Sequence, residues 1–324
     1  MLLVCCSLLF LAGCSREDES ADTVTQYRLK WLYNMSVVGD LYADAEGFFK
    51  EHGLKVAVKS GGPERDALKE LEIGRAQFGV ASADQVIRAI DKGAPLVVIT
   101  QLFQVNPLQW LYRTDRFSMN SPSDLHNKII GITFGGNDET IMRALLRKHA
   151  MELSEVELFS VRYDYAPFYL GKVDLWPVYR NAEGIVISEK LGSQNETAGF
   201  FNPDQFGIRF VANSVVTTRE IASEQPELVQ KFVKALLDGW QHALDPANAR
   251  QAIDLVSSFD RETSREILEK QLAATRMLMQ PPDGKPFGWI DIVAWQETER
   301  IMLDQKLISG PVSVEKSLVQ VVID

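Results

Sequence analysis

Residues 27–60 read YRLKWLYNMSVVGDLYADAEGFFKEHGLKVAVKS, and this segment carries the first evidence for the architecture of the chain. Apolar and polar residues alternate over 27–33, with Trp31 on the apolar side, as in a half-buried β-strand. A helix with one apolar stripe is predicted over 38–52, and a second alternating strand over 54–58. A strand, a helix and a strand in this order predict two parallel strands joined by a right-handed crossover.

Ligands on open α/β sheets bind at the carboxyl ends of the strands. Here those ends carry Trp31, Asn34 and Ser36, followed by Ser60, Gly61 and Gly62. An aromatic face beside an amide and a glycine-lined backbone suits a flat polar heterocycle. Trp31 is equally explained as a core residue, because Trp is usually largely buried, and Asn34 as a turn former. Both interpretations stay open at this point.

The same alternation of strands and helices continues and then restarts, which argues for two α/β lobes. The first series has predicted strands at 78–82, 96–103 and 108–112. The second has strands at 128–134, 156–162 and 173–179, with helices at 139–151, 164–170 and 182–191. A strand at 208–218 returns to the first lobe, and four helices are predicted at 220–244, 247–257, 261–279 and 290–305.

We therefore predict lobe 1 from residues 27–112 plus 209–324 and lobe 2 from residues 113–208. Two crossings, near residues 112–121 and 202–211, would join the lobes. A ligand would sit between them and draw them together by closure about this hinge.

The formal net charge is −10 over 324 residues, without a basic block. Nucleic-acid binding is excluded on this ground, because phosphate contacts need clustered Lys and Arg. The three cysteines are Cys5, Cys6 and Cys14. The rest of the chain therefore offers no disulfide, thiolate metal site or cysteine nucleophile.

An apolar run at residues 2–11 ends in LAGC, so that small residues precede Cys14. This resembles a bacterial lipoprotein signal, residues 1–14, in which Cys14 becomes the lipidated first residue. A hydrophilic tether, residues 15–26, would follow. The alternative is a fortuitous cysteine in a signal anchor. We expect an exported protein, lipid-anchored to a membrane in the periplasm or at the cell surface.

Several motifs resemble the thiamine-pyrimidine branch of the periplasmic solute-binding proteins, whose relatives bind nitrate, sulfonate and taurine and include the thiamine-pyrimidine synthase. They are WLY at 31–33, GDLYADAEGFFKEHGLKV at 39–56, SGGP at 60–63, GRAQFGV at 74–80, FQVNP at 103–107, SPSDL at 121–125, KIIGI at 128–132 and DLWPVYRNAE at 174–183.

The resemblance implies an α/β, two-lobed periplasmic binding protein fold of type II, with a helical C-terminal extension packed on lobe 1. It also implies a monomer without a cofactor that captures a thiamine pyrimidine precursor, or a similar small heterocycle, for an ABC permease and its ATPase. One alternative is an enzyme like the synthase, but its cysteine-rich iron-linked motif is missing. Another is a sensor for a different small solute such as riboflavin, nitrate or a sulfonate.

The predicted cleft is lined from both lobes, so that a flat ring stacks on aromatic faces and hydrogen bonds fix its edge. The candidate ligand-binding residues are Trp31, Asn34, Gly61, Gly62, Ser82, Gln104, Asn106, Gly135, Asn137, Tyr165, Trp176, Tyr179, Asn181 and Glu183.

Glu183 could accept from the exocyclic amine of an aminopyrimidine, or it could be a solvated glutamate at the start of a helix. The loop 135–138, GGND, could cradle an anion or form a tight turn with an N-cap. Asp138 and the scarcity of Arg and Lys in the proposed cleft argue for an uncharged or cationic ligand. No metal-ligand cluster and no catalytic triad stand out.

Overall fold

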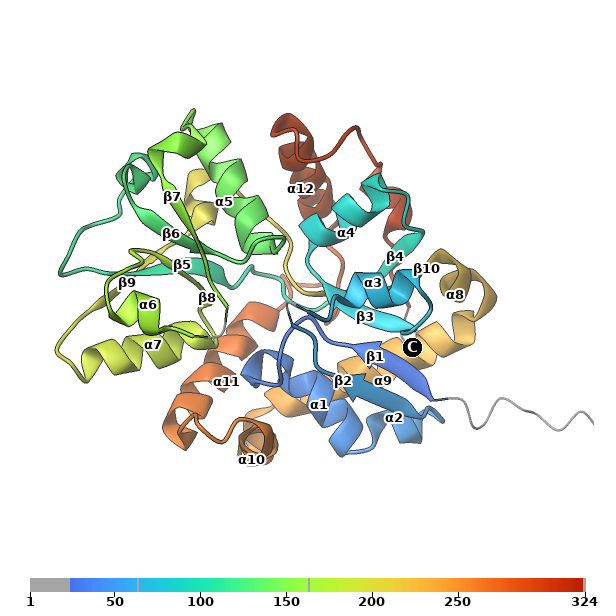
Figure 1. The fold of residues 1–324 in the computed structure, drawn as a ribbon. Helices are drawn as coiled ribbons and strands as arrows, with labels where there is room; N and C mark the ends of the chain where they lie inside the picture. The colour runs from blue at the N-terminus through green and yellow to red at the C-terminus, as the bar shows by residue number, and fades with distance from the viewer. Residues whose placement is uncertain (1–23, 63, 163, 323–324) are drawn as a thin grey trace, which may run out of the picture.

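The computed structural model describes residues 24–322 apart from residues 63 and 163. Cys14, the predicted lipoprotein signal and most of the predicted tether lie outside the described residues. Within the described part of the chain, no helix is long and apolar enough to span a membrane. The described chain forms two lobes side by side, joined by crossing segments (Figure 1).

Lobe 1 is built on a five-stranded sheet with the order β2-β1-β3-β10-β4. β1 is parallel to both β2 and β3, which confirms the predicted parallel pair, whereas β10 is antiparallel to its neighbours β3 and β4. The strands are β1 (Thr25–Arg28), β2 (Val56–Lys59), β3 (Phe78–Ala81), β4 (Leu96–Gln101) and β10 (Ser214–Thr218).

Two predictions for the opening segment are wrong. β1 ends at Arg28, so Trp31 lies in a series of bends after the strand and not in the strand itself. The predicted helix over 38–52 is split at Gly47, whose φ of 82° is a left-handed conformation that glycine adopts readily. Two shorter helices result, α1 (Val38–Ala45) and α2 (Phe48–Glu51).

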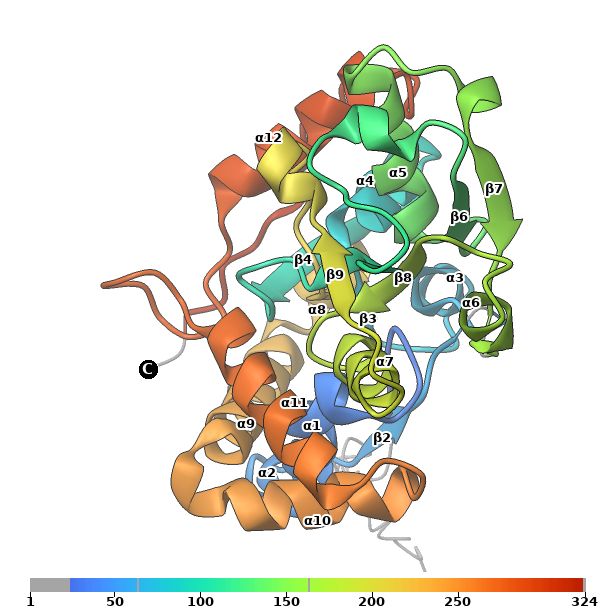
Figure 2. The same ribbon diagram turned by 90° about the vertical axis from the view of Figure 1, so that its left-hand side faces the viewer.

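The remaining helices of lobe 1 cover its sheet and include the C-terminal series (Figure 2). Helix α9 packs along α1, and the Phe232 ring on α9 stacks on Phe78 of β3 with centroids 3.8 Å apart. These helices are α3 (Ala67–Glu72), α4 (Ala83–Asp91), α8 (Arg219–Glu224), α9 (Pro226–Leu244), α10 (Ala249–Phe259), α11 (Arg265–Met279) and α12 (Ile292–Asp304).

Lobe 2 has a three-stranded antiparallel sheet with the order β8-β5-β9 and a parallel pair, β6 and β7. A parallel bridge between Ile130 and Leu175 connects the two. The elements are β5 (Leu108–Arg113), β6 (Ile129–Ile132), α5 (Asn137–Lys148), β7 (Glu157–Ser160), α6 (Ala166–Tyr169), β8 (Trp176–Tyr179), α7 (Glu183–Gly192) and β9 (Ala198–Phe201).

The pairing of β5 with β8 and β9 differs from the expected division, which left residues 108–112 in lobe 1. The first crossing is accordingly the short segment 102–107 between β4 and β5, and the second is 202–213 between β9 and β10. We propose lobe boundaries at these two segments in place of those expected from the sequence.

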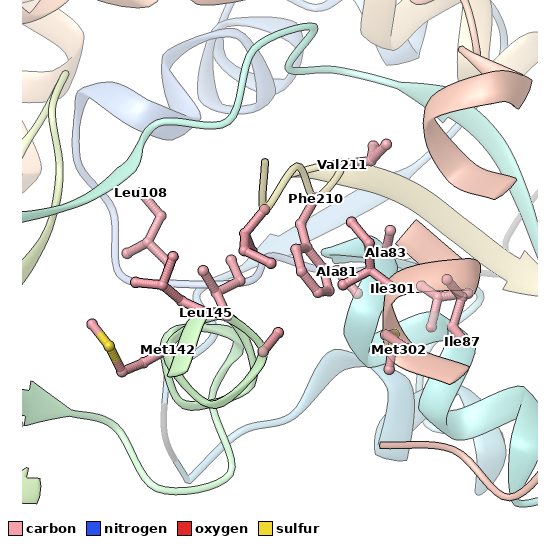
Figure 3. Close-up of a cluster of buried hydrophobic side chains, with 14 of the residues drawn as sticks. Ala81, Ala83, Ile87, Leu108, Met142, Leu145, Phe210, Val211, Ile301 and Met302 are labelled. Atoms are coloured by element: carbon pink, nitrogen blue, oxygen red, sulfur yellow. The ribbon is translucent and has the colours of Figure 1, made fainter. Parts of the chain in front are cut away.

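The hinge is filled by apolar side chains that belong to both lobes (Figure 3). Phe210 on the second crossing lies between Ala81 of lobe 1 and Leu145 on α5 of lobe 2, and all three side chains are buried in one cluster. Such a cluster links the two sheets through apolar contacts, so the lobes share part of their core.

The C-terminal segment seals the edge of the lobe 1 sheet. Leu318 forms a parallel bridge with Val98 of β4, and the N–H of Val319 donates to the Val98 carbonyl at 2.8 Å. The buried Glu299 carboxylate on α12 accepts from the backbone N–H groups of residues 312–314 at 2.7–2.9 Å. These contacts fix the end of the chain to lobe 1.

Candidate ligand-binding site between the lobes

The turn after β1 places a lysine and an aromatic residue at the edge of lobe 1. The N–H of Gly61 donates to the Trp31 carbonyl at 2.9 Å, and a Cβ at Gly61 would lie 2.6 Å from the Lys30 carbonyl carbon. Only glycine therefore allows the two backbones to approach this closely. Asn34 accepts from the N–H of Ser36 at 2.9 Å, so its side chain caps the next turn.

Lys30 reaches from this turn to lobe 2. Its Nζ lies 2.8 Å from the Tyr179 hydroxyl and 3.2 Å from Oδ1 of Asn137, the first residue of α5. The Tyr179 hydroxyl in turn donates to Oδ1 of Asn213 at 3.1 Å, on the second crossing. One hydrogen-bonded network therefore joins lobe 1, lobe 2 and the hinge.

A second interlobe contact is centred on Asn181, which is buried in the turn after β8. Its Nδ2 donates to Oγ1 of Thr275 on α11 at 2.9 Å and lies 3.3 Å from Oγ of Ser36. Nearby, Nε2 of Gln271 donates to the Ala182 carbonyl at 3.1 Å. Helix α11 thus packs on lobe 1 and is also hydrogen-bonded to lobe 2.

Aromatic and acidic side chains surround the start of α7. Glu183 accepts from the N–H of Tyr179 at 3.3 Å, and burial raises the pKa of its carboxyl above the usual value. Burial, together with the charge of Glu183, also raises the pKa of Tyr165. The Tyr165 ring meets the buried Trp176 edge-on, with centroids 6.0 Å apart. This cluster offers an acceptor beside aromatic faces, the combination expected for a ring with an amino edge.

Other predicted ligand contacts have structural partners in this conformation. Ser82 caps α4 and donates to Asp84 at 2.7 Å. Nε2 of Gln104 donates to two backbone carbonyls at 3.0 Å each, and Asn106 bonds the Phe210 carbonyl and the Leu108 N–H at 2.9 Å each. Asn106 therefore ties the two crossings together. The last two predicted residues, Gly62 and Gly135, lie in turns with positive φ.

Trp31 directly follows Lys30 in the chain. The structure brings together Asn137, Tyr179 and Asn181 around the interlobe contacts, but it adds partners that the sequence did not suggest. These are Lys30, Arg88, Thr140, Asn213 and Thr275. Each contact spans a long stretch of sequence, so no local spacing could have identified it. Lys30 alone carried a signal, as a cation beside Trp31 in a segment expected to line the cleft.

Two sequence arguments against an anionic ligand are corrected. Lys30 and Arg88 both make hydrogen bonds across the lobes, so the region between the lobes is not poor in cations. Asp138 is buried and accepts from the N–H of Thr133 at 2.6 Å, so it stabilises its own loop. Burial raises its pKa to about 6. Throughout the described chain, no three His, Cys, Asp or Glu side chains are grouped as a metal site would need.

The sequence matches the family described as NMT1/THI5 like over residues 34–249. The riboflavin-binding protein RibY of Chloroflexus aurantiacus is 25% identical over 309 residues, 89% of this chain and 83% of the relative. A putative thiamine biosynthesis protein of Haemophilus influenzae is 26% identical over 56% of each chain. A third relative is the 4-amino-5-hydroxymethyl-2-methylpyrimidine phosphate synthase THI13 of Saccharomyces cerevisiae. It is 20% identical, and the match covers 87% of this chain and 91% of the relative.

Solved structures give the same fold. The alkanesulfonate-binding protein SsuA of Xanthomonas axonopodis superimposes with a TM-score of 0.70 at 17% identity, covering 92% of this chain and 98% of that one. The periplasmic aliphatic sulphonate-binding protein SsuA of Escherichia coli gives a TM-score of 0.68 at 14% identity, with 93% of each chain covered. The predicted two-lobed fold is confirmed. The chain belongs to the NMT1/THI5-like family and has the fold of the periplasmic binding proteins.

Proposed function

We propose that this protein is the solute-binding subunit of an ABC importer and that it captures a small planar nitrogen heterocycle between its lobes. The observation that carries the proposal is the set of polar side chains from both lobes, in particular Lys30, Tyr179, Asn137 and Asn181, that meet across the hinge. Such groups can exchange their interlobe partners for those of a ligand when the lobes open and close.

The ligand class that we favour is an aminopyrimidine of the thiamine pathway. Glu183 would accept from the exocyclic amine, and Tyr165, Trp176 and Trp31 would supply aromatic faces. Kinship with a family that includes proteins named for thiamine biosynthesis supports this choice. A riboflavin-type flavin is the second candidate, because the similarity to RibY extends over most of both chains.

We further propose that the chain binds and does not catalyse, and that it acts as a monomer in the periplasm or at the cell surface. Lipidation at Cys14 would hold it at the membrane beside the permease and the ATPase. Incubation with pyridoxal phosphate and iron tests the enzymatic alternative, since a synthase-like enzyme would release a pyrimidine product.

Isothermal titration of the purified protein with aminopyrimidines and with riboflavin tests the proposed ligand. We expect saturable one-to-one heat with one class and a change in tryptophan fluorescence. A protein that gives no heat with either class, but binds an aliphatic sulfonate or nitrate, would retain the binding role and lose the proposed ligand.

A further inference from the structure

We propose that Lys30 determines the specificity of the cleft by meeting an oxyanion substituent on the ring of the ligand. This inference rests on the proposed function and narrows it from a planar heterocycle to a heterocycle that carries a phosphate or carboxylate.

The first observation is the position of the Lys30 ammonium. It comes from lobe 1 and contacts the Tyr179 hydroxyl and the Asn137 carboxamide oxygen, both of lobe 2. Among the residues that the structure describes, no carboxylate lies within 4.0 Å of Nζ, whereas Arg28, Arg113 and Arg143 each have one. An ammonium has three donors, and both of these partners are neutral, so its charge is available for a ligand anion.

The second observation is an unused donor beside Lys30. Asn137 is 7% exposed, its Oδ1 is occupied by Lys30, and its buried Nδ2 has no hydrogen-bond partner in the described part of the protein. A buried donor left unpaired destabilises the protein, because it has lost its hydrogen bonds to water. An acceptor on the ligand would satisfy it, and the same acceptor would lie next to the ammonium.

The third observation is the order of charges along Tyr179. Its hydroxyl lies against Lys30, and its backbone N–H lies against the Glu183 carboxylate. The acidic and basic groups therefore flank one tyrosine. A ring with an amino edge at Glu183 and an oxyanion at Lys30 would match both groups in that order.

The decisive experiment compares ligand pairs that differ only in the oxyanion, in the wild type and in Lys30→Met. The pairs are 4-amino-5-hydroxymethyl-2-methylpyrimidine with its phosphate ester or its 5-carboxylate analogue, and riboflavin with its phosphate ester. We expect the wild type to bind an anionic member about tenfold or more tighter, as a charge-assisted hydrogen bond allows. Lys30→Met should remove that preference, because it should weaken binding of the anionic member about tenfold or more relative to binding of the neutral member.

Two further variants sharpen the comparison. Lys30→Arg should keep most of the preference because the charge is retained. Lys59→Met removes an exposed cation at the end of β2 and should leave all affinities unchanged. Equal wild-type affinities for the charged and neutral members would overturn the proposal. So would an equal loss for both members in Lys30→Met, which would make Lys30 an interlobe contact only.

A separate arm distinguishes failure of this inference from failure of the proposed function. If no ring compound binds, the proposed function fails. Thermal denaturation then compares how far inorganic phosphate and acetate stabilise the wild type and Lys30→Met. A stabilisation that is lost in Lys30→Met supports an oxyanion site at Lys30. The oxyanion site is rejected if these anions do not raise the melting temperature of the wild type, or if they raise it equally in both proteins.

Discussion

Asp40 is a carboxylic acid held inside lobe 1, where charge is costly. It is 1% exposed, and its Oδ1 accepts from the Tyr27 hydroxyl at 2.5 Å. Burial raises its pKa to about 7 even though the hydrogen bond from Tyr27 acts in the opposite direction. At neutral pH this side chain is therefore close to its titration midpoint within a hydrophobic core.

This pKa predicts how stability depends on pH. Because the folded pKa exceeds the usual value of 3.8, the folded chain binds the proton more tightly than the unfolded chain. The contribution of this proton to the stability of the folded protein is fully present below pH 3.8 and is lost as the pH rises to about 7. We expect Asp40→Asn to gain about 4 kcal/mol of unfolding free energy relative to wild type across this range.

Urea denaturation of both proteins between pH 4 and pH 8 measures the difference in unfolding free energy. The gap should widen up to about pH 7 and stay constant above it. A gap that is the same at every pH would mean that Asp40 does not titrate in this interval.

Glu183 is the second residue with a testable role, this time in binding. Glu183→Gln keeps an acceptor for the Tyr179 N–H but removes the charge that would face an amino edge. We expect a loss of about 1.5–3 kcal/mol in affinity for an aminopyrimidine, measured by calorimetry. Glu157→Gln, at an exposed position on β7, is the matched control. Unchanged affinity in Glu183→Gln would remove Glu183 from the site.

At the scale of elements, the close approach of α1 and α9 depends on two glycines. A Cβ added at Gly39 would collide with the Trp240 ring, and one at Gly239 would lie 2.5–2.9 Å from atoms of Ala43. Two of the Ala43 atoms belong to the backbone, so the helices would have to separate. The distance between α1 and α9 therefore depends on the two glycines as much as on the apolar side chains between the helices.

Gly239→Ala should destabilise the protein by about 1–3 kcal/mol or more, because overpacking a well-packed interface forces backbone shifts. Chemical denaturation measures the loss. Gly192→Ala, at the end of α7, is the control, because a Cβ there meets nothing within 4 Å and alanine favours helix. If both variants are equally stable, α1 and α9 pack more loosely than described.

Local sequence patterns located most elements but not their ends. The alternation over residues 27–33 predicts a strand, yet β1 stops at Arg28, and the backbone bends from residue 30 while Trp31 still accepts from the N–H of Gly61. The helix break at Gly47 was missed because an apolar stripe continues past it into Phe48 and Phe49. In both cases, a backbone constraint overrode the periodicity of the side chains.

For the whole molecule, the contact of α11 with lobe 2 sets how easily the lobes part. Asn181 donates to Thr275 and lies near Ser36, both on the opposite lobe. Asn181→Ala should weaken the closed form and raise the radius of gyration in small-angle scattering. Thr275→Val removes the main acceptor and should have the same effect. Asn120→Ala, at an exposed position in lobe 2, should not. An unchanged radius of gyration in the first two variants would mean that other contacts hold the lobes together.

The sequence supported two lobes, the family and several residues of the interlobe region. The first crossing that it predicted differs from the one that we propose from the pairing of β5. Residues 108–112 looked like one more strand of lobe 1, and their true partners, such as Tyr179 opposite Leu108, lie far away in sequence. The sequence does not mark Lys30 as a site residue, because a lysine in an alternating strand normally lies on the solvated face. The partners of β5 and the interlobe contacts of Lys30 both lie far away in sequence, and local spacing cannot predict such contacts.

The sealed edge of the lobe 1 sheet has a consequence for handling the protein. Removing residues from 312 onwards would uncover the outer backbone groups of β4, including the Val98 carbonyl that now receives the Val319 N–H. A bare edge of this kind recruits strands from neighbouring copies. A shortened chain should therefore polymerise at high concentration while its hinge and polar contacts stay intact, so an affinity tag is better extended from the existing tail than substituted for it.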